Sequence, residues 1–99
     1  IVKNFPNAFV RTDLVERLGP GPRNLVLAGF MTHMCVNSTA RGAFNLGYSP
    51  TVVAAATATR ALPGPDGSAV DAAALQTASL AAVADLFAVV VPDVRAIPD

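Results

Sequence analysis

The chain is predicted to form an α/β fold, in which helices cover both faces of a parallel, Rossmann-like sheet in three layers. Helix-like and strand-like segments alternate along its 99 residues. The strand-like segments are continuously apolar, which is typical of parallel strands buried on both faces and joined by right-handed crossovers. Ligands bind at the carboxyl ends of the strands in such sheets, so we expect a site there.

The amino-terminal segment is predicted to be mostly irregular. Residues 1–10 are interpreted as the end of a strand that runs into a loop, with an interruption at Pro6. Thr12 is the expected N-cap of a short helix. The sequence Gly-Pro-Gly-Pro at 19–22 ends that helix.

A buried strand and a helix follow. Residues 25–28 (LVLA) are the expected strand. Apolar residues then recur at helical spacing, which predicts a helix over about 32–46 with Thr32 as its N-cap. This helix carries Cys35, the only cysteine of the chain.

The second half is predicted to contain two strands separated by a loop and a helix. In chain order these elements are strand 51–55, loop 61–67, a helix from Ser68 to about Leu86, strand 87–91 and a terminal loop over 93–99. Ser68 and Asp71 form a pair similar to a capping box at the start of the helix. Asp66 is interpreted as a turn residue and Asp71 as a capping residue.

Composition excludes several classes of partner. The chain has 53% hydrophobic residues, 14% charged residues and a formal net charge of zero. The absence of a basic patch argues against binding to nucleic acid or to an anionic membrane. No apolar run reaches the roughly 18 residues that a membrane span needs. A single cysteine cannot form an internal disulfide, which favours a cytoplasmic protein.

The first residue and the apolar surplus indicate a partial domain. The chain begins with Ile1 rather than methionine, and it is richer in apolar residues than an average soluble domain. We therefore expect it to be the C-terminal half of a larger α/β domain.

Cys35 is the strongest candidate for chemistry. A thiol at a helix N-terminus lies at the positive end of the helix dipole, among unpaired N–H groups. This environment favours thiolate, the reactive form of cysteine. The same N–H groups can hold a developing oxyanion. The alternative interpretation is a small, buried and inert cysteine.

Three further side chains are weaker candidates. Lys3, the only lysine, is either a solvated amine or a partly buried cation that stabilises the thiolate. His33, the only histidine, is expected to be exposed or to line the substrate site rather than to pair with Cys35. Arg60 is expected to make a structural ion pair or a helix-end contact. One histidine and one cysteine fall short of a metal site, so no metal and no cofactor are predicted.

Three segments resemble the isochorismatase-like cysteine hydrolases, the family of nicotinamidases, N-carbamoylsarcosine amidases and isochorismatases. Residues 3–9 (KNFPNAF) with 12–14 (TDL) are similar to the family's segment around its catalytic lysine. Residues 29–36 (GFMTHMCV), continued by 38–43 (STARGA), are similar to its nucleophile motif. Residues 57–60 (TATR) and the loop, helix and strand after them resemble the family's C-terminal end.

The resemblance implies an Asp-Lys-Cys triad. Cys35 would be the nucleophile and Lys3 its cationic partner, and the aspartate base would lie on a strand upstream of Ile1. Residues 1–99 would then be the C-terminal part of a single isochorismatase-like hydrolase domain. The resemblance also implies a cis Phe30–Met31 peptide bond, with the N–H groups of Met31 and Cys35 as the oxyanion hole.

The predicted function is hydrolysis of a small amide through a thioester intermediate. Phe5, Phe9 and Phe30 are predicted to form an apolar wall beside the substrate. The family commonly forms homo-oligomers, so a dimer or tetramer is expected. Two alternatives stay open: vinyl-ether hydrolysis of the isochorismatase type, and an inactive binding or scaffold module. The sequence departs from the family pattern at two places, and both affect the assignment of the substrate and the anchoring of the loop. Ala55-Ala56 stands where many relatives have Asp-Ala, and Gln76 stands where relatives often have a histidine.

Overall fold

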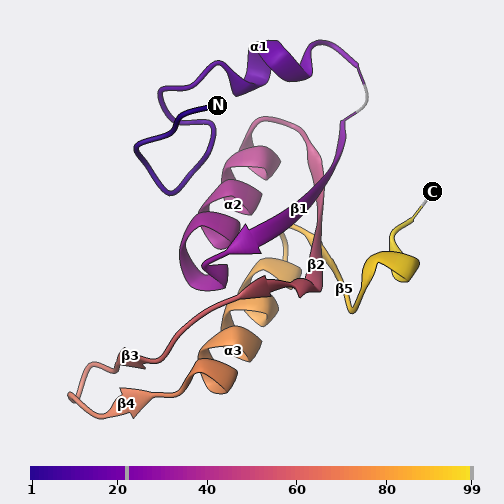
Figure 1. The fold of residues 1–99 in the computed structure, drawn as a ribbon. Coiled ribbons are helices and arrows are strands. Elements are labelled where there is room, and N and C mark those ends of the chain that lie inside the picture. The colour runs from indigo at the N-terminus through magenta and orange to yellow at the C-terminus, as the bar shows by residue number, and fades with distance from the viewer. Residues whose placement is uncertain (22, 99) are drawn as a thin grey trace.

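The protein is described from a computed structural model, which covers residues 1–21 and 23–98. Figure 1 shows the elements in chain order. They are α1 (Leu14–Leu18), β1 (Asn24–Phe30), a π-helical turn η1 (Thr32–Val36), α2 (Asn37–Asn45), β2 (Ser49–Ala58), β3 (Leu62–Pro63), β4 (Ala69–Val70), α3 (Ala72–Ala84), β5 (Val89–Val91) and a 3₁₀ turn η2 (Val94–Ala96).

The three longer strands form a parallel sheet, which confirms the predicted α/β fold class. Their order is β1-β2-β5, and both pairs are parallel. The pairing of β1 with β2 is irregular near its carboxyl end. Leu27 pairs with Val52, but Gly29, two residues later, pairs with Thr57, which lies five residues after Val52. Strand β2 therefore contains more residues than β1 between these two pairs.

Helices α2 and α3 lie on the same face of this sheet. Two successive right-handed crossovers that advance in one direction along a sheet place both helices on one side. The core contains buried residues from η1, α2, β2 and α3: Val36, Ala40, Val52 and Val83. The contact of all these elements at one cluster fixes the position of η1, which carries Cys35, against the sheet.

The opposite face of the sheet is largely open in this chain. The exposed fractions of Val26, Phe30 and Val89 are 54%, 74% and 56%. Along β1, exposed and half-buried residues alternate. The expectation that both faces of every strand are buried is therefore wrong for β1, because both crossover helices cover its other face.

The amino-terminal segment differs from its prediction in two respects. Residues 1–10 form bends and turns and contain no strand. The N-cap position of α1 is Asp13 rather than Thr12. The Thr12 hydroxyl still accepts from the Leu14 amide, the first of the helix, at 3.4 Å, and it donates to the Ala8 carbonyl at 2.6 Å, which ties the segment to the start of α1. The predicted helix end at 19–22 includes Pro22, which lies outside the described residues.

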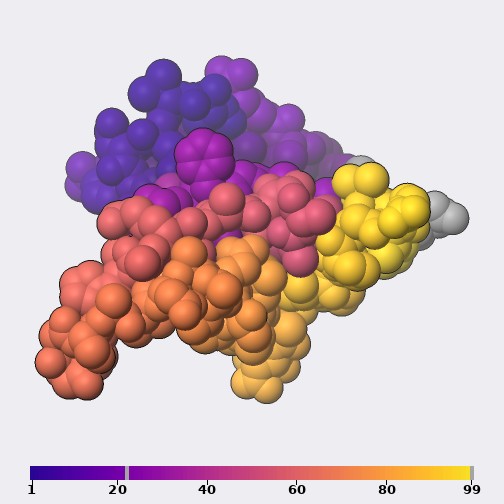
Figure 2. Space-filling view, turned by 60° about the horizontal axis from the view of Figure 1, so that its bottom comes forward, coloured from indigo at the N-terminus to yellow at the C-terminus, as the bar shows by residue number. Residues whose placement is uncertain are grey.

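The predicted loop at 61–67 contains part of a short hairpin. Strands β3 and β4 pair antiparallel through Leu62 with Val70 and Pro63 with Ala69. Figure 2 shows that this hairpin projects from the body of the molecule. Its turn is held by Asp66, whose carboxylate accepts from the Ser68 amide at 3.0 Å and from the Ser68 hydroxyl at 2.6 Å.

The cap of α3 is Asp71, as predicted, whose side chain accepts from the Ala74 amide at 2.7 Å. Ser68 takes no part in this cap, because its hydroxyl is bound to Asp66. The last strand is shorter than predicted and begins at Val89. The predicted terminal loop contains η2, and its last residue, Asp99, lies outside the described residues. Within the described part of the chain, no helix has the length and apolar character required to cross a membrane.

Candidate active site

The candidate site lies at the carboxyl end of β1, where the parallel sheet predicts it. Gly29 has a φ of +129°, in a region that glycine adopts far more readily than other residues. The Phe30–Met31 peptide bond is cis, in agreement with the family resemblance. Together these two features lead the chain from the strand directly into η1.

Cys35 lies in η1, directly before α2. The Asn37 amide donates to the Thr32 carbonyl, and the Val36 amide donates to the Met31 carbonyl at 3.3 Å. Met31, rather than Thr32, occupies the N-cap position, and no side chain caps the turn. Thr32 is only 1% exposed, because it begins the turn that packs on the core. The Cys35 thiol is half-buried and free.

Lys3 and Cys35 are in direct contact although 32 residues separate them. The Lys3 Nζ lies 3.2 Å from the Cys35 Sγ. The same ammonium donates to the Phe5 carbonyl at 3.1 Å and to the Pro6 carbonyl at 3.4 Å. Lys3 itself is exposed, as expected of the solvated amine rather than of the partly buried cation, and its ammonium still contacts the thiol. A cation at this distance attracts a thiolate, the nucleophilic form of cysteine.

Thr39 fastens the lysine segment to the cysteine helix. Its hydroxyl accepts from the Ala8 amide at 3.0 Å and donates to the Pro6 carbonyl at 3.3 Å. Because Thr39 lies four residues after Cys35, both side chains lie on the same side of the helix. The loop bound by Thr39 therefore passes beside the thiol, and Lys3 reaches it.

Asn7 and Gly42 form a second attachment of this segment. A Cβ atom added at Gly42 would lie 2.8 Å from the Asn7 Cγ, so the Asn7 side chain would have to shift if this position carried a larger residue. The Asn7 carboxamide oxygen also accepts from the Phe9 amide at 2.9 Å. Neither Asn7, Gly42 nor Thr39 was singled out from the sequence alone. A glycine inside a helical pattern was the one available signal, since it often marks close packing.

Gly42→Ala is expected to destabilise the protein although alanine is the better helix former. Alanine improves helix propensity by about 1 kcal/mol, but overpacking against Asn7 costs about 1–3 kcal/mol. We expect a net loss in the free energy of unfolding, measured by denaturant titration. Asn45→Ala is the matched control, because Asn45 is exposed on the same helix. A gain in stability for Gly42→Ala, equal to that of the control, would contradict the close approach.

A cavity of about 280 Å³ contains both reactive groups. Its lining includes Lys3 and Cys35 together with Leu14, Gly29 and Phe30. Among the described residues that line it, none is acidic. This cavity joins the lysine segment, the end of β1 and the start of the cysteine helix.

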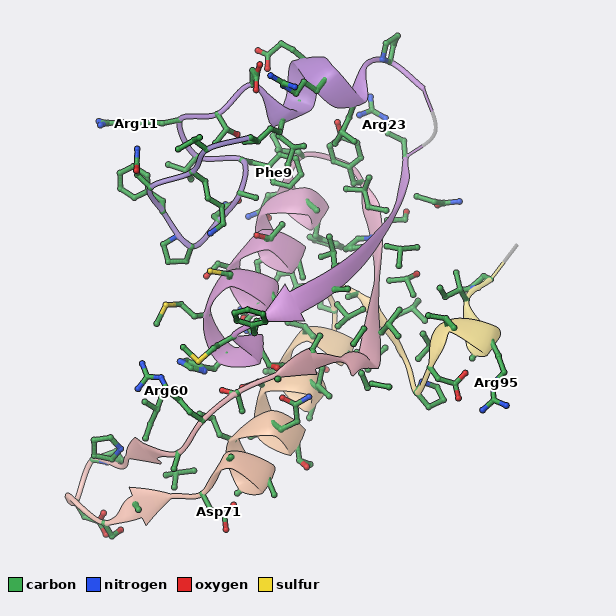
Figure 3. All side chains as sticks on the ribbon, viewed as in Figure 1. Phe9, Arg11, Arg23, Arg60, Asp71 and Arg95 are labelled. Carbon is green, nitrogen blue, oxygen red and sulfur yellow. The ribbon has the colours of Figure 1, made fainter. Side chains whose placement is uncertain are left out.

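The three predicted phenylalanines occupy different places. Phe30 lines the cavity, whereas Phe5 and Phe9 are not among its lining residues. Phe9 stacks on Tyr48, with 5.7 Å between ring centroids, just beyond the carboxyl end of α2. The Arg11 guanidinium lies 5.6 Å from the centroid of the Phe5 ring. Figure 3 shows Phe9 near Arg23, far from Arg60 and the carboxyl end of β1.

The His33 side chain is half-buried beside the end of β2. Its Nδ1 lies 2.7 Å from the Thr59 hydroxyl, and its Nε2 is buried. The structure does not show the exposed histidine that was one of the two predicted alternatives, because the end of β2 lies beside η1. The other alternative, a histidine that lines the substrate site, stays a prediction. Arg60 is exposed, and the ion pairs of the described residues join only Asp13 to Arg17 and Asp93 to Arg95.

The carboxylates with altered acidity lie outside the cavity lining. Hydrogen bonds from the Ser68 hydroxyl and amide lower the pKa of Asp66. The Arg95 side chain lowers the pKa of Asp93. Within residues 1–21 and 23–98, no group of three histidine, cysteine or acidic residues is arranged to hold a metal ion. The described residues thus supply a thiol and an ammonium to this site, but no carboxylate.

Known proteins with similar sequence and structure share this arrangement of elements. The profile of the isochorismatase domain matches residues 1–93. A secreted isochorismatase effector of Verticillium dahliae is 38% identical over 92 residues, which make up 92% of this chain and 46% of the relative. The crystal structure of an isochorismatase from Pseudomonas putida KT2440 is 42% identical, with a TM-score of 0.89 over 96% of this chain and 49% of that one.

A third similar structure is a pyrazinamidase/nicotinamidase from Streptococcus mutans UA159. It is 31% identical, with a TM-score of 0.73, over 90% of this chain and 44% of that one. The chain thus spans about half the length of these relatives. The match over residues 1–93 shows that the chain belongs to the isochorismatase family.

Proposed function

We propose that this chain provides the nucleophile and its cationic partner to a cysteine hydrolase that cleaves a small amide. The observation that carries the proposal is the 3.2 Å contact between the Lys3 Nζ and the Cys35 Sγ. Both residues line one cavity at the carboxyl end of a parallel strand, which is where such folds bind ligands. The similarity to a pyrazinamidase/nicotinamidase further supports an amide as substrate.

The reaction proceeds in two stages. The Cys35 thiolate attacks the amide carbonyl carbon and forms a C–S bond, while the C=O electron pair moves to oxygen. The N–H groups of Met31 and Cys35 hold this oxyanion. When the carbonyl re-forms, the C–N bond breaks and the nitrogen leaves with a proton as ammonia or an amine. Water then attacks the thioester, gives the acid and restores the thiol.

The base that takes the thiol proton is proposed to lie outside this chain. The cavity receives no carboxylate from the described residues, and the family resemblance places an aspartate on an upstream strand. Lys3 fixes the thiolate by its charge and leaves proton transfer to that aspartate. The proposed enzyme therefore needs the other half of the domain for turnover.

A second candidate function is vinyl-ether hydrolysis. The 42% identity to an isochorismatase of known structure favours it. The vinyl-ether bond that is cleaved in this reaction involves no amide carbonyl and no amine leaving group, so no acyl-thioester forms at Cys35. The cytoplasmic location and the homo-oligomeric state of the protein remain predictions. One relative is named as a secreted effector.

Product analysis with the full-length protein tests these alternatives. Nicotinamide, pyrazinamide and isochorismate are offered separately, and ammonia and pyruvate are measured. The amide proposal predicts ammonia release and an acyl adduct on the Cys35 peptide in acid-quenched samples, read by mass spectrometry. Pyruvate release without ammonia or adduct supports the vinyl-ether reaction. No product, together with alkylation of Cys35 by iodoacetamide no faster than that of a free thiol, supports an inactive module.

A further inference from the structure

The end of β2 and the residue after it are hydrogen-bonded to α3 and to η1, the turn that carries Cys35. The Thr59 hydroxyl, just after β2, lies 2.7 Å from His33 Nδ1 on η1. Two residues earlier, the Thr57 hydroxyl accepts from the Gln76 side chain of α3 at 2.8 Å. The segment 57–59 is therefore fixed by α3 on one side and contacts the cysteine turn on the other.

The same segment also pairs with the last residues of β1. Gly29 pairs with Thr57, and Phe30 pairs with Ala58. Phe30 precedes Met31 and His33 follows it by two residues. Residues 30–33, which include the Met31 amide, are thus held at both ends by residues 57–59. Phe30 is held by its pairing with Ala58, and His33 by its contact with Thr59.

His33 has no competing side-chain partner. In the described part of the chain, its Nε2 is buried without a hydrogen-bond partner. The contact between Nδ1 and Thr59 is therefore the polar interaction that fixes the orientation of this ring. His33 lies two residues before Cys35, so the ring orientation and the path of η1 are linked by covalent geometry.

We propose that Thr59 is a positioning residue which, through His33, fixes the backbone of residues 31–35 where the oxyanion forms. This inference rests on the proposed amide hydrolysis and adds a residue to it. Thr59 is not required to touch the substrate. Its hydroxyl restricts η1, so the Met31 and Cys35 amides are held in place before the carbonyl is attacked.

Hydrogen–deuterium exchange tests the inference without turnover. In the full-length protein, Thr59→Val is expected to raise amide exchange in the peptide over residues 31–37 by about fivefold, the effect of losing one neutral hydrogen bond. Thr59→Ser keeps the hydroxyl and should restore wild-type exchange. Thr51→Val is the matched control, because Thr51 lies near the other end of β2, where it pairs with Val26, away from η1.

Kinetics supply the catalytic readout. Thr59→Val is expected to lower kcat about five- to tenfold with KM changed less than about twofold, as when an interaction made in the transition state is weakened. The rate of Cys35 alkylation by iodoacetamide should stay at the wild-type value, because Lys3 still contacts the thiol. His33→Phe should reproduce both effects, and adding Thr59→Val to it should have no further effect.

The outcomes separate this inference from the proposed function. Wild-type exchange in Thr59→Val, or a failure of Thr59→Ser to restore it, would overturn the inference whatever the turnover. A fall in kcat that serine does not rescue would overturn it as well. If the wild-type protein hydrolyses no amide, the proposed function fails, while the exchange measurements still decide whether Thr59 fixes the turn.

Discussion

Cys35→Ala is expected to abolish amide hydrolysis while the fold is retained. Removing a catalytic nucleophile lowers kcat by about 10⁴- to 10⁶-fold in comparable enzymes. The fold is expected to remain because the thiol is only half-buried. The Lys3 segment also remains attached, since Thr39 binds its backbone at Ala8 and Pro6. Initial rates of ammonia release and a thermal unfolding curve measure the two effects separately.

Met34→Ala is the matched control for this substitution. Met34 neighbours Cys35 in η1, but its side chain is 38% exposed and is not among the residues that line the cavity. We expect its ammonia release to stay within about threefold of wild type, as for surface changes outside a site. Turnover by Cys35→Ala above about one per cent of wild type would exclude Cys35 as the nucleophile.

Lys3→Met is expected to have the second largest effect. It removes the ammonium that contacts Cys35 and keeps a side chain of similar length. Loss of one charge that stabilises a reacting group costs about 10²- to 10³-fold in kcat. The rate of Cys35 alkylation by iodoacetamide at neutral pH should fall as well, because the cation that attracts the thiolate is gone. Stopped-flow alkylation and steady-state kinetics on the same preparation give both values.

Arg11→Met separates the local contact from a general charge effect. It removes one positive charge from the same segment, but the Arg11 guanidinium lies over the Phe5 ring and not at the thiol. Its alkylation rate should remain that of the wild type. Equal losses in the two variants would show that Lys3 acts only through net charge, contrary to the contact in the structure.

The sequence predicts the sheet well because its strands are short apolar runs bounded by turn residues. The parallel arrangement and the Asp71 cap follow from patterns within a few residues, and both are confirmed. The exposure of Val26 on β1 could not be predicted, because an apolar run looks the same whether one or two layers cover it. The β3–β4 hairpin was missed because each of its strands has only two residues.

For the candidate site, the resemblance indicated Lys3 and Cys35, but periodicity alone did not bring them together. Their contact depends on Thr39, whose hydroxyl joins the irregular segment to α2, and on Asn7, whose carboxamide packs against Gly42 of that helix. Such contacts leave no periodic signal, because they involve single polar groups in an irregular backbone. The same reason explains why the contact between His33 and Thr59 was not foreseen.

The hydrogen bonds of Lys3 have a consequence for the evolution of selectivity. An ammonium has three N–H donors, and Lys3 directs them at two backbone carbonyls and one sulfur. No donor remains for the substrate, so the proposed hydrolase could accept a different acyl group without any change in the reactive pair. Diversity in a mutant library is therefore best placed at Leu14 and Phe30 of the cavity wall, with residues 3–8 left constant. The residues proposed to carry the reactivity and the residues proposed to set the preference for a substrate are therefore different residues of one cavity.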